Sequence, residues 1–332
     1  MYVRGMVSVK VSVKIVVACL LLTHAAAFAG LVVAQSYPVK PIRMVVAFPP
    51  GGLADVVARI IFQPVTQQLG HNIIIDNRPG ALGAIAGDIV AKAPPDGYTL
   101  LFTTSSTMSA VPTLTRRPPY DPVRDFTPIT DVGRVTFFMF VHPSVPARNM
   151  TELISHIRAN PGKLAYGTTS ATPMIATAQL LLAHQLDALR VPYKGDALTA
   201  TDLVGGRIQF AFMSTVPGYA QAREGKLRTL ATLMPKRSAM APDIPTLEEA
   251  GVKGVSTTSW AGLFGPARLP DAVVDRLSRE FRAVLTRPDI VDKLGQQGFL
   301  AHASTPAELG AYVKEQLETW RRIVREAGIP VE

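Results

Sequence analysis

Cysteine is almost absent from this sequence, because its 332 residues contain only Cys19. Since Cys19 falls within the first 34 residues, the rest of the chain can form no disulfide, thiol nucleophile or cysteine-ligated metal site. Those 34 residues also lack Asp and Glu, and hold the cations Arg4, Lys10 and Lys14. Without them, 31 Lys and Arg stand against 25 Asp and Glu, a net charge of +6. No dense basic stripe accompanies this small surplus, so a nucleic-acid partner is not expected.

Motifs for catalysis and for cofactors are also missing. The sequence holds no HExxH pair, no GxSxG nucleophile elbow and no GxxxxGK phosphate loop. The glycines after Asn77 have the wrong spacing for a dinucleotide fingerprint. The histidines of the body are scattered: His71, His142, His156, His184 and His302. We therefore expect no catalytic residue, no cofactor and no metal site.

The first 34 residues have the features of a secretory leader. Three cations precede an apolar run at residues 15–34, and small residues allow cleavage after Ala29 or after Ala34. We expect the second site, because the chain turns polar at Gln35. The run could instead span a bilayer uncleaved, or Cys19 could be a lipoprotein site, although too few apolar residues precede it. Export of a body without cysteine indicates a bacterial periplasm.

Apolar runs typical of strands alternate with helical patterns over the remaining sequence. We expect strands at residues 42–48, 72–76, 98–103, 135–141, 164–166, 190–193, 208–213 and 227–233, and helices at 55–69, 83–92, 150–159, 175–186, 199–204, 271–285 and 306–327. This order predicts an α/β fold of mainly parallel sheets flanked by helices.

Two crossings of the chain predict two lobes with a cleft between them. The boundaries we expect are lobe 1 at residues 35–138 and 262–332 and lobe 2 at residues 139–261, with hinge crossings near 138–143 and 257–264.

The loop after the first strand is the strongest candidate for an anion site. The first amides of a helix lack intrahelical partners and carry the positive end of the helix dipole. Two glycines allow a ligand to approach the backbone, and two prolines stiffen the loop. A tight turn without a ligand is an equal alternative. The candidate contacts here are Phe48, Pro49, Pro50, Gly51, Gly52, Ala54 and Asp55, the last of which also has the i,i+4 spacing of a helix pair with Arg59.

Hydroxyl groups follow two other strands and could donate to a carboxylate. The candidates are Ser105 and Ser106 after the third strand, and Thr168, Thr169, Ser170 and Thr172 in the second lobe. Solvated turn hydroxyls are the alternative for the first group. Asp202 is a further candidate, with a capping or turn role as its alternative.

These segments resemble, in this order, the Bug family of periplasmic solute receptors of tripartite tricarboxylate transporters (TctC-type). The matching stretches are residues 37–43, 48–52 with Asp55, Ala58 and Arg59, 77–81, 95–101, 119–122, 125–129, 160–164, 191–195, 202–206, 225–228, 242–246 and 260–264. The resemblance implies a two-lobed, type II periplasmic-binding-protein (Venus-flytrap) fold. It also implies a monomer that delivers a small carboxylate to membrane transporter subunits.

The solute implied is a di- or tricarboxylate, an acidic amino acid or an aromatic acid. Backbone amides within residues 50–54 would hold one carboxylate, and the loop at 168–172 the other polar end. The family usually has Pro at Ala47 and Gly at Leu82, and its second-lobe loop is usually rich in Ser and Gly. Further departures are Ala176, where a His is usual, and Leu198-Thr199, where Pro-Ala is usual. A sensor that signals to a membrane kinase, or a periplasmic hydrolase or lyase, remains as an alternative.

Overall fold

The computed structural model describes residues 37–238, 240–255, 259–326, 328–329 and 331. The expected leader, with Cys19 and both cleavage sites, lies outside these residues. Residues 40–332 form one compact unit. Within the part of the chain that is described, no helix is both long and apolar enough to cross a membrane.

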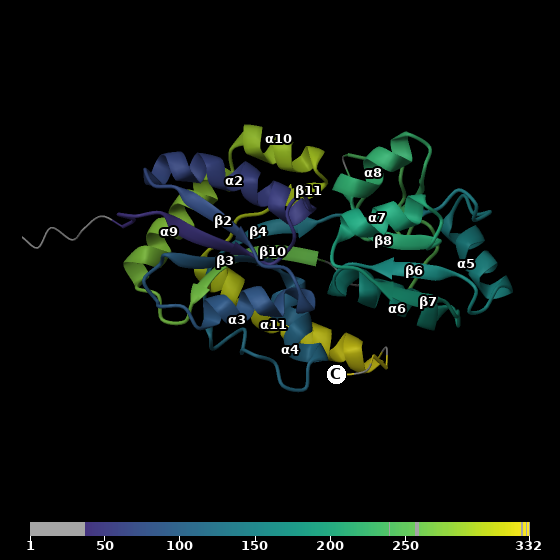
Figure 1. The fold of residues 1–332 in the computed structure, drawn as a ribbon, viewed down its shortest axis with the longest axis horizontal. Helices are drawn as coiled ribbons and strands as arrows, with labels where there is room; N and C mark the ends of the chain where they lie inside the picture. Colours follow the sequence, from purple (N-terminus) through teal and green to yellow (C-terminus); the bar gives the residue numbers. More distant parts are fainter. Residues whose placement is uncertain (1–36, 239, 256–258, 327, 330, 332) are drawn as a thin grey trace, which may run out of the picture. The chain divides into compact units, whose positions relative to one another are not determined.

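The first sheet has six strands in the order β11-β4-β10-β3-β1-β2 (Figure 1). Its strands are β1 (Ile42–Val46), β2 (Ile73–Asn77), β3 (Thr99–Thr104), β4 (Phe126–Val135), β10 (Ser259–Pro266) and β11 (Phe299–Ala301). The pairs β1–β2 and β1–β3 are parallel, which confirms the βαβαβ arrangement expected at this end of the sequence.

The second sheet has five strands in the order β7-β6-β8-β5-β9. Its strands are β5 (Phe137–Val141), β6 (Ala165–Thr168), β7 (Leu189–Pro192), β8 (Phe210–Ser214) and β9 (Arg228–Thr232). The pairs β6–β7 and β6–β8 are parallel. The α/β class and the two-sheet organisation predicted from the sequence are therefore present.

Most strands of each sheet run in one direction, as predicted, but each sheet also contains antiparallel pairs that the sequence did not place. β10 pairs antiparallel with both β3 and β4, and β5 pairs antiparallel with both β8 and β9. The cause is the double crossing of the chain: β4 leads out of the first sheet and β10 begins its return, so the two run in opposite directions.

The predicted strand at 135–141 is in fact the join between two sheets. β4 ends at Val135 and β5 begins at Phe137, so the chain changes sheets at Thr136, just before the expected hinge. β10 belongs to the first sheet from Ser259 onwards, while residues 257–258 of the second expected hinge lie outside the described residues.

Helices cover both faces of each sheet (Figure 1). They are α2 (Leu53–Leu69), α3 (Ala84–Ala91), α4 (Val111–Leu114), α5 (Met150–Ala159), α6 (Ala171–Ala183), α7 (Asp196–Val204), α8 (Thr215–Arg223), α9 (Asp271–Leu285), α10 (Pro288–Gln296) and α11 (Pro306–Glu326), with a 3₁₀ turn η1 (Ala81–Gly83) and a π-helical segment η2 (Ser106–Ala110). α6 and α7 begin earlier than the sequence predicted, and α8, α10, β4 and β11 were not predicted.

Local sequence signals fix several helix ends. Asn149 accepts a hydrogen bond from the Glu152 amide at 2.9 Å, which caps α5. Thr305 and Glu308 bond reciprocally ahead of α11, as a capping box. Gly70 ends α2 in the left-handed conformation, with φ of 72°.

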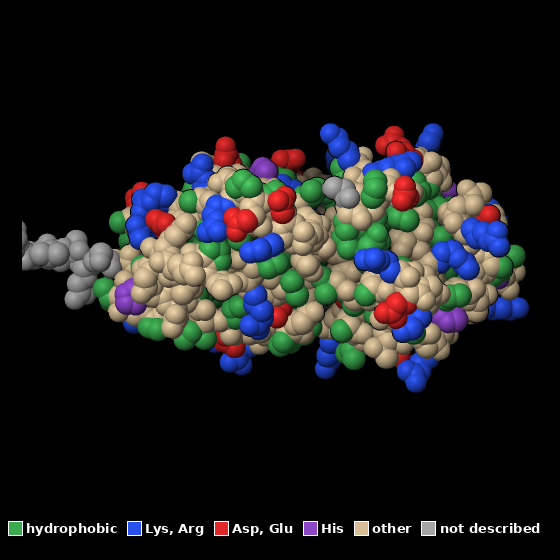
Figure 2. Space-filling view, turned by 90° about the horizontal axis from the view of Figure 1, so that it is seen from above, with side chains coloured by type: hydrophobic (Ala, Val, Ile, Leu, Met, Phe, Trp, Pro, Cys, Tyr) green, Lys and Arg blue, Asp and Glu red, His purple; other side chains and the backbone are tan. Residues whose placement is uncertain are grey.

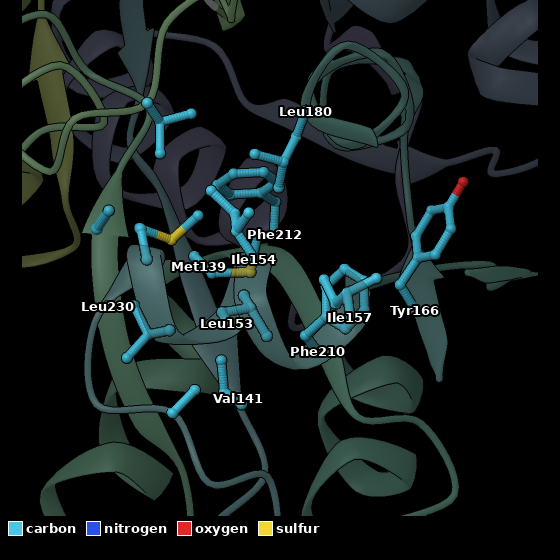
Figure 3. Packing of buried hydrophobic residues seen from close by; sticks show 14 of the residues in the cluster. Met139, Val141, Leu153, Ile154, Ile157, Tyr166, Leu180, Phe210, Phe212 and Leu230 are labelled. Atoms are coloured by element: carbon cyan, nitrogen blue, oxygen red, sulfur yellow. The ribbon is translucent and has the colours of Figure 1, made fainter. Parts of the chain in front are cut away.

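Each sheet has an apolar core on each face. In the second sheet, Met139 and Phe212 pack against Leu153 of α5 and Leu180 of α6 (Figure 3). In the first sheet, Phe102 meets Phe62 of α2 edge to face, with ring centroids 5.8 Å apart. Such burial holds each sheet rigid, so the loops at strand ends have fixed starting points.

Two leucines on α6 test this core assignment. Leu180 is fully buried, whereas Leu182 is 56% exposed. We expect Leu180→Ala to lower the free energy of unfolding by about 2–5 kcal/mol, because it leaves a cavity. Leu182→Ala, its control on the same helix, should change it by less than about 0.5 kcal/mol. Denaturant titration measures both, and equal losses would contradict the packing.

Candidate functional site

A cavity lies where the strand ends of the first sheet face those of the second. Its walls come from the α2 start, β3, β4, β5, β10 and β11, and from the loops that lead into α6, α7 and α8. The lining residues are Phe48, Pro49, Gly52, Leu53, Ala54, Val57, Phe102, Thr104, Val135, Phe137, Thr169, Ser170, Gly195, Asp196, Ser214, Ser259, Ala261 and Phe299. Its volume of about 70 Å³ holds on the order of five waters, which limits an enclosed solute to a small molecule.

The lining of this cavity is apolar apart from hydroxyls and one carboxylate. The hydroxyls are those of Thr104, Thr169, Ser170, Ser214 and Ser259, and the carboxylate is that of Asp196. None of the described lining residues is Lys, Arg or His. An anion bound here would thus be held by N–H and O–H dipoles, without a cationic side chain.

The start of α2 supplies such N–H groups. Gly52, Leu53 and Ala54 line the cavity, and no hydrogen bond within the described residues occupies their N–H groups. Gly52 is the N-cap residue. Because it has no side chain, its backbone itself lines the cavity. A helix end with free amides attracts negative charge.

Asp55 supports this loop from behind and does not line the cavity. Its carboxylate accepts hydrogen bonds from the Gly51 amide at 3.1 Å, from Asn77 Nδ2 at 3.1 Å and from Arg59 Nε at 2.8 Å. Asn77 also donates to the Phe48 carbonyl. Asp55 therefore ties both sides of the diglycine bend to α2, and the Gly51 amide turns away from any solute.

The charge of Asp55 is stabilised by these contacts. Burial alone would raise the pKa of its carboxyl group, but the hydrogen bonds from Arg59, Gly51 and Asn77 together hold that pKa below its ordinary value. The ionised carboxylate is thus part of the native loop.

The second-lobe loop contributes fewer contacts than the sequence indicated. Thr169 and Ser170 line the cavity, whereas Thr168 and Thr172 are buried beside it. The Thr172 hydroxyl lies 3.3 Å from that of Ser105.

Ser106 also faces α6 and does not line the cavity. Its Oγ accepts a hydrogen bond from the Ala171 amide at 3.2 Å. The predicted hydroxyls Ser105 and Ser106 thus join the two sheets across the base of the cavity, and Thr104 takes the lining position.

Asp202 lies inside α7, away from the cavity lining, and it neither caps a helix nor forms a turn. Its carboxylate accepts from Tyr193 Oη at 2.8 Å and from Arg207 Nη1 at 2.6 Å. Burial and the Asp202 carboxylate raise the pKa of the Tyr193 hydroxyl to about 12, so this bond persists across the physiological range. Pro50 is also outside the lining.

Asp196 is the lining residue that the sequence analysis missed. It is the first residue of α7, and its Oδ2 accepts from the Ser214 amide at 3.0 Å and from the Ser214 hydroxyl, while Thr169 also bonds to its carboxyl group. Burial raises the pKa of its carboxyl group, and those hydrogen bonds only partly offset the effect. The feature of the sequence that could have indicated Asp196 is its position directly after Gly195, in a loop between a strand and a helix.

A family model, several relatives and several solved structures match this chain. The family model of the tripartite tricarboxylate transporter family receptor matches residues 57–329. The chain belongs to this receptor family. It is therefore a solute-binding receptor, in a family that is one of receptors and not of enzymes.

The alignments with individual relatives cover almost the whole chain of the receptor. It is 32% identical to the protein BugT of Bordetella pertussis over 312 residues, which cover 91% of this chain and 94% of BugT. A solved structure of R. palustris Rpa4515 with adipate is 31% identical, has a TM-score of 0.85, and the match covers 89% of this chain and 99% of that one.

A second solved structure is MatC (Rpa3494) from Rhodopseudomonas palustris with bound malate. It is 28% identical to the receptor, with a TM-score of 0.81, and the match covers 87% of this chain and 100% of that one. The resemblance to Bug and TctC receptors that the sequence motifs indicated is confirmed.

The described residues offer no obvious metal site. Among them, no group of three or more His, Cys, Asp or Glu side chains is placed to hold a metal ion. The cavity hydroxyls also have no histidine or lysine beside them in the described lining.

The Asp55 network predicts a specific pH dependence of stability. Because the native pKa of Asp55 is lowered, its ionised form stabilises the fold above its unfolded pKa of about 3.9, and this contribution is lost as pH falls through the native value. We expect Asp55→Asn to lower the free energy of unfolding by about 1–3 kcal/mol at pH 7. The deficit should shrink below about pH 4.

Asp289→Asn is the control for this measurement, because Asp289 forms an exposed pair with Arg287. It should leave the stability at pH 7 nearly unchanged. Denaturant titrations between pH 2 and about 8 compare the two. A deficit for Asp55→Asn that persists undiminished at the acidic end would contradict the assignment.

Proposed function

We propose that this receptor captures a small carboxylate-bearing solute in the cavity and delivers it to a tripartite tricarboxylate-type membrane transporter. The observation that carries the proposal is the set of free amides of Gly52, Leu53 and Ala54 at the cavity wall. They offer a carboxylate several donors at the positive end of a helix. The adipate and malate in related structures support this class of solute.

The energy of such contacts is adequate without a cation. Hydrogen bonds to a charged group contribute about 1.5–3 kcal/mol each. Several bonds from α2 amides and from the hydroxyls of Thr104, Thr169 or Ser170, less the cost of ordering, reach the roughly 8 kcal/mol of a micromolar complex. Apolar neighbours such as Phe102 and Phe299 strengthen these bonds by excluding water.

Closure of the two lobes completes this site. Contacts between the lobes include the bonds of the Ala171 amide to Ser106 and of the Thr215 hydroxyl to the Gln297 carbonyl. A solute held by both walls would add to these contacts and favour the closed form. The closed form is then the state that the membrane transporter recognises.

Gly195 permits a direct test of closure. A methyl group built at Gly195 would lie 2.9 Å from Pro49 Cγ, on the opposite lobe. Overpacking of this kind costs about 1–3 kcal/mol, so Gly195→Ala should weaken solute binding by roughly five- to a hundredfold. Calorimetric titration with malate, adipate, citrate, glutamate and benzoate measures this for whichever acid binds.

Gly295→Ala is the matched control, because a methyl group at Gly295 of α10 would meet no atom within 4 Å. It should leave the affinity unchanged. If no acid in the panel binds the wild-type receptor, the carboxylate assignment is wrong. If Gly195→Ala binds as tightly as the wild type, closure across Pro49 is wrong.

Location and delivery are tested separately. We propose that residues 1–34 direct export to the periplasm and are removed, so the exported form should begin at Gln35. Mass spectrometry of the periplasmic fraction checks this; an uncleaved mass or a lipid on Cys19 would favour the alternatives. Crosslinking of the solute-bound receptor in membranes should capture transporter subunits, whereas capture of a sensor kinase would favour a signalling role.

A further inference from the structure

Asp196 carries an acceptor atom that no described residue satisfies. Its Oδ2 has two donors, the amide and hydroxyl of Ser214, and the Thr169 side chain also bonds to the carboxyl group. Its Oδ1 is fully enclosed and has no hydrogen-bond partner. An enclosed acceptor without a donor is costly, and a carboxylate oxygen more so than a neutral one.

No protein cation compensates this carboxylate. The described cavity lining contains no Lys, Arg or His, and no ion pair involves Asp196. Lys194, two residues earlier, is exposed, and Arg59 at the opposite wall is bonded to Asp55. The cavity therefore holds one net negative group of its own, beside the region where an anionic solute is expected.

Burial raises the pKa of the Asp196 carboxyl group in the absence of a solute, and a bound cation would favour its ionised form. Both contacts to Oδ2 come from donors on Ser214, which match an ionised carboxylate. Asp196 also opens α7, where the helix dipole stabilises negative charge. What the side chain lacks is therefore a donor at Oδ1, and a cationic N–H group forms the strongest bond of that kind.

The two walls of the cavity thus require opposite groups. Free amides at Gly52, Leu53 and Ala54 suit a carboxylate, whereas Asp196 suits a positively charged donor. A methyl group built at Gly195 would lie 2.9 Å from Pro49 Cγ, so the loops that carry these two sites lie close together across the cavity. Because Oδ1 is shielded from solvent in this structure, a solute that contacts both walls must bind before the lobes close.

We propose that the receptor selects solutes that carry a protonated amine as well as a carboxylate, and that Asp196 is the residue that recognises the amine. This inference rests on the proposed function, since it assigns the carboxylate to the α2 amides. The solute class is then the amino carboxylates, and nitrogen-free acids of the same shape bind more weakly.

The wild-type receptor can be tested with matched acids that differ at one group. The series aspartate, malate and succinate varies only the substituent at C2 (amine, hydroxyl or hydrogen), and the pair 2-aminoadipate and adipate varies only the amine. By calorimetry at pH 7, we expect the amine-bearing member to bind at least tenfold more tightly than succinate or adipate. Equal or weaker binding of both amino acids would overturn the inference.

Variants of Asp196 assign the preference to this residue. Asp196→Asn and Asp196→Ser should each reduce the affinity for the amine-bearing acid at least tenfold, and should leave the affinity for its nitrogen-free partner equal or higher. Asp202→Asn is the control, because Asp202 is paired with Arg207 and Tyr193 outside the lining. It should preserve the preference.

The outcomes separate this inference from the proposed function. Binding of succinate and adipate as tightly as their amino counterparts would leave the carboxylate receptor intact and overturn the role of Asp196. A preference that survives in both Asp196 variants would do the same. Failure of every acid to bind would overturn both proposals. If one variant does not fold, as judged by thermal melting, the other variant and the wild-type series still decide.

Discussion

The site depends on one buried carboxylate, that of Asp55, which is bonded to Gly51, Asn77 and Arg59. Without this anchor, the diglycine bend would be a short loop with several conformations, and the amides that follow it would have no fixed direction. Asp55 uses the Gly51 amide and so orients the bend, which leaves the amides of Gly52 to Ala54 unpaired at the cavity wall. The ion pair of Asp55 and Arg59 thus lies behind the site, where the Arg59 cation does not line the cavity.

The two lobes are joined by more than the crossing strands. The C-terminal part of α11 packs Trp320 and Ile323 against Ala171 and Ile175 of α6, an apolar contact between elements of the two lobes. The polar contacts from Ser106 and Thr215 are weaker individually and lie nearer the cavity. Apolar contacts of this kind do not depend on water, whereas hydroxyl contacts can be exchanged for bonds to water at low net cost. The charges on the surface have no such role, and on the face in Figure 2 Lys and Arg are spread among Asp and Glu.

The sequence predicted the fold class, the alternation of elements and the first loop because these follow from local periodicity and from turn chemistry. It could not place the antiparallel returns, since the direction of β10 depends on a crossing that involves residues over a hundred positions apart. The apolar run at 135–141 hid the change of sheet at Thr136, because both flanking strands are buried and read alike. Ser105 and Ser106 were correctly expected at the sheet edge, but their partners Thr172 and Ala171 lie on the other lobe. Leu82, where the family usually has Gly, adopts a positive φ of 56° that only a tertiary environment explains.

Among the helices that begin beside the cavity, α2, α6 and α7 differ in what occupies their first turns. At α6, the Ala171 amide is taken by Ser106. At α7, the first residue is itself the carboxylate Asp196. At α2, the equivalent amides are free, since its first-turn acid Asp55 is turned away toward Arg59. A helix start therefore offers free amides to an anion at the α2 wall. At the facing wall, the start of α7 carries the carboxyl group of Asp196. A solute that matched the first wall alone would leave the second unsatisfied, which is why the chemistry of Asp196 bears on which acids the receptor accepts.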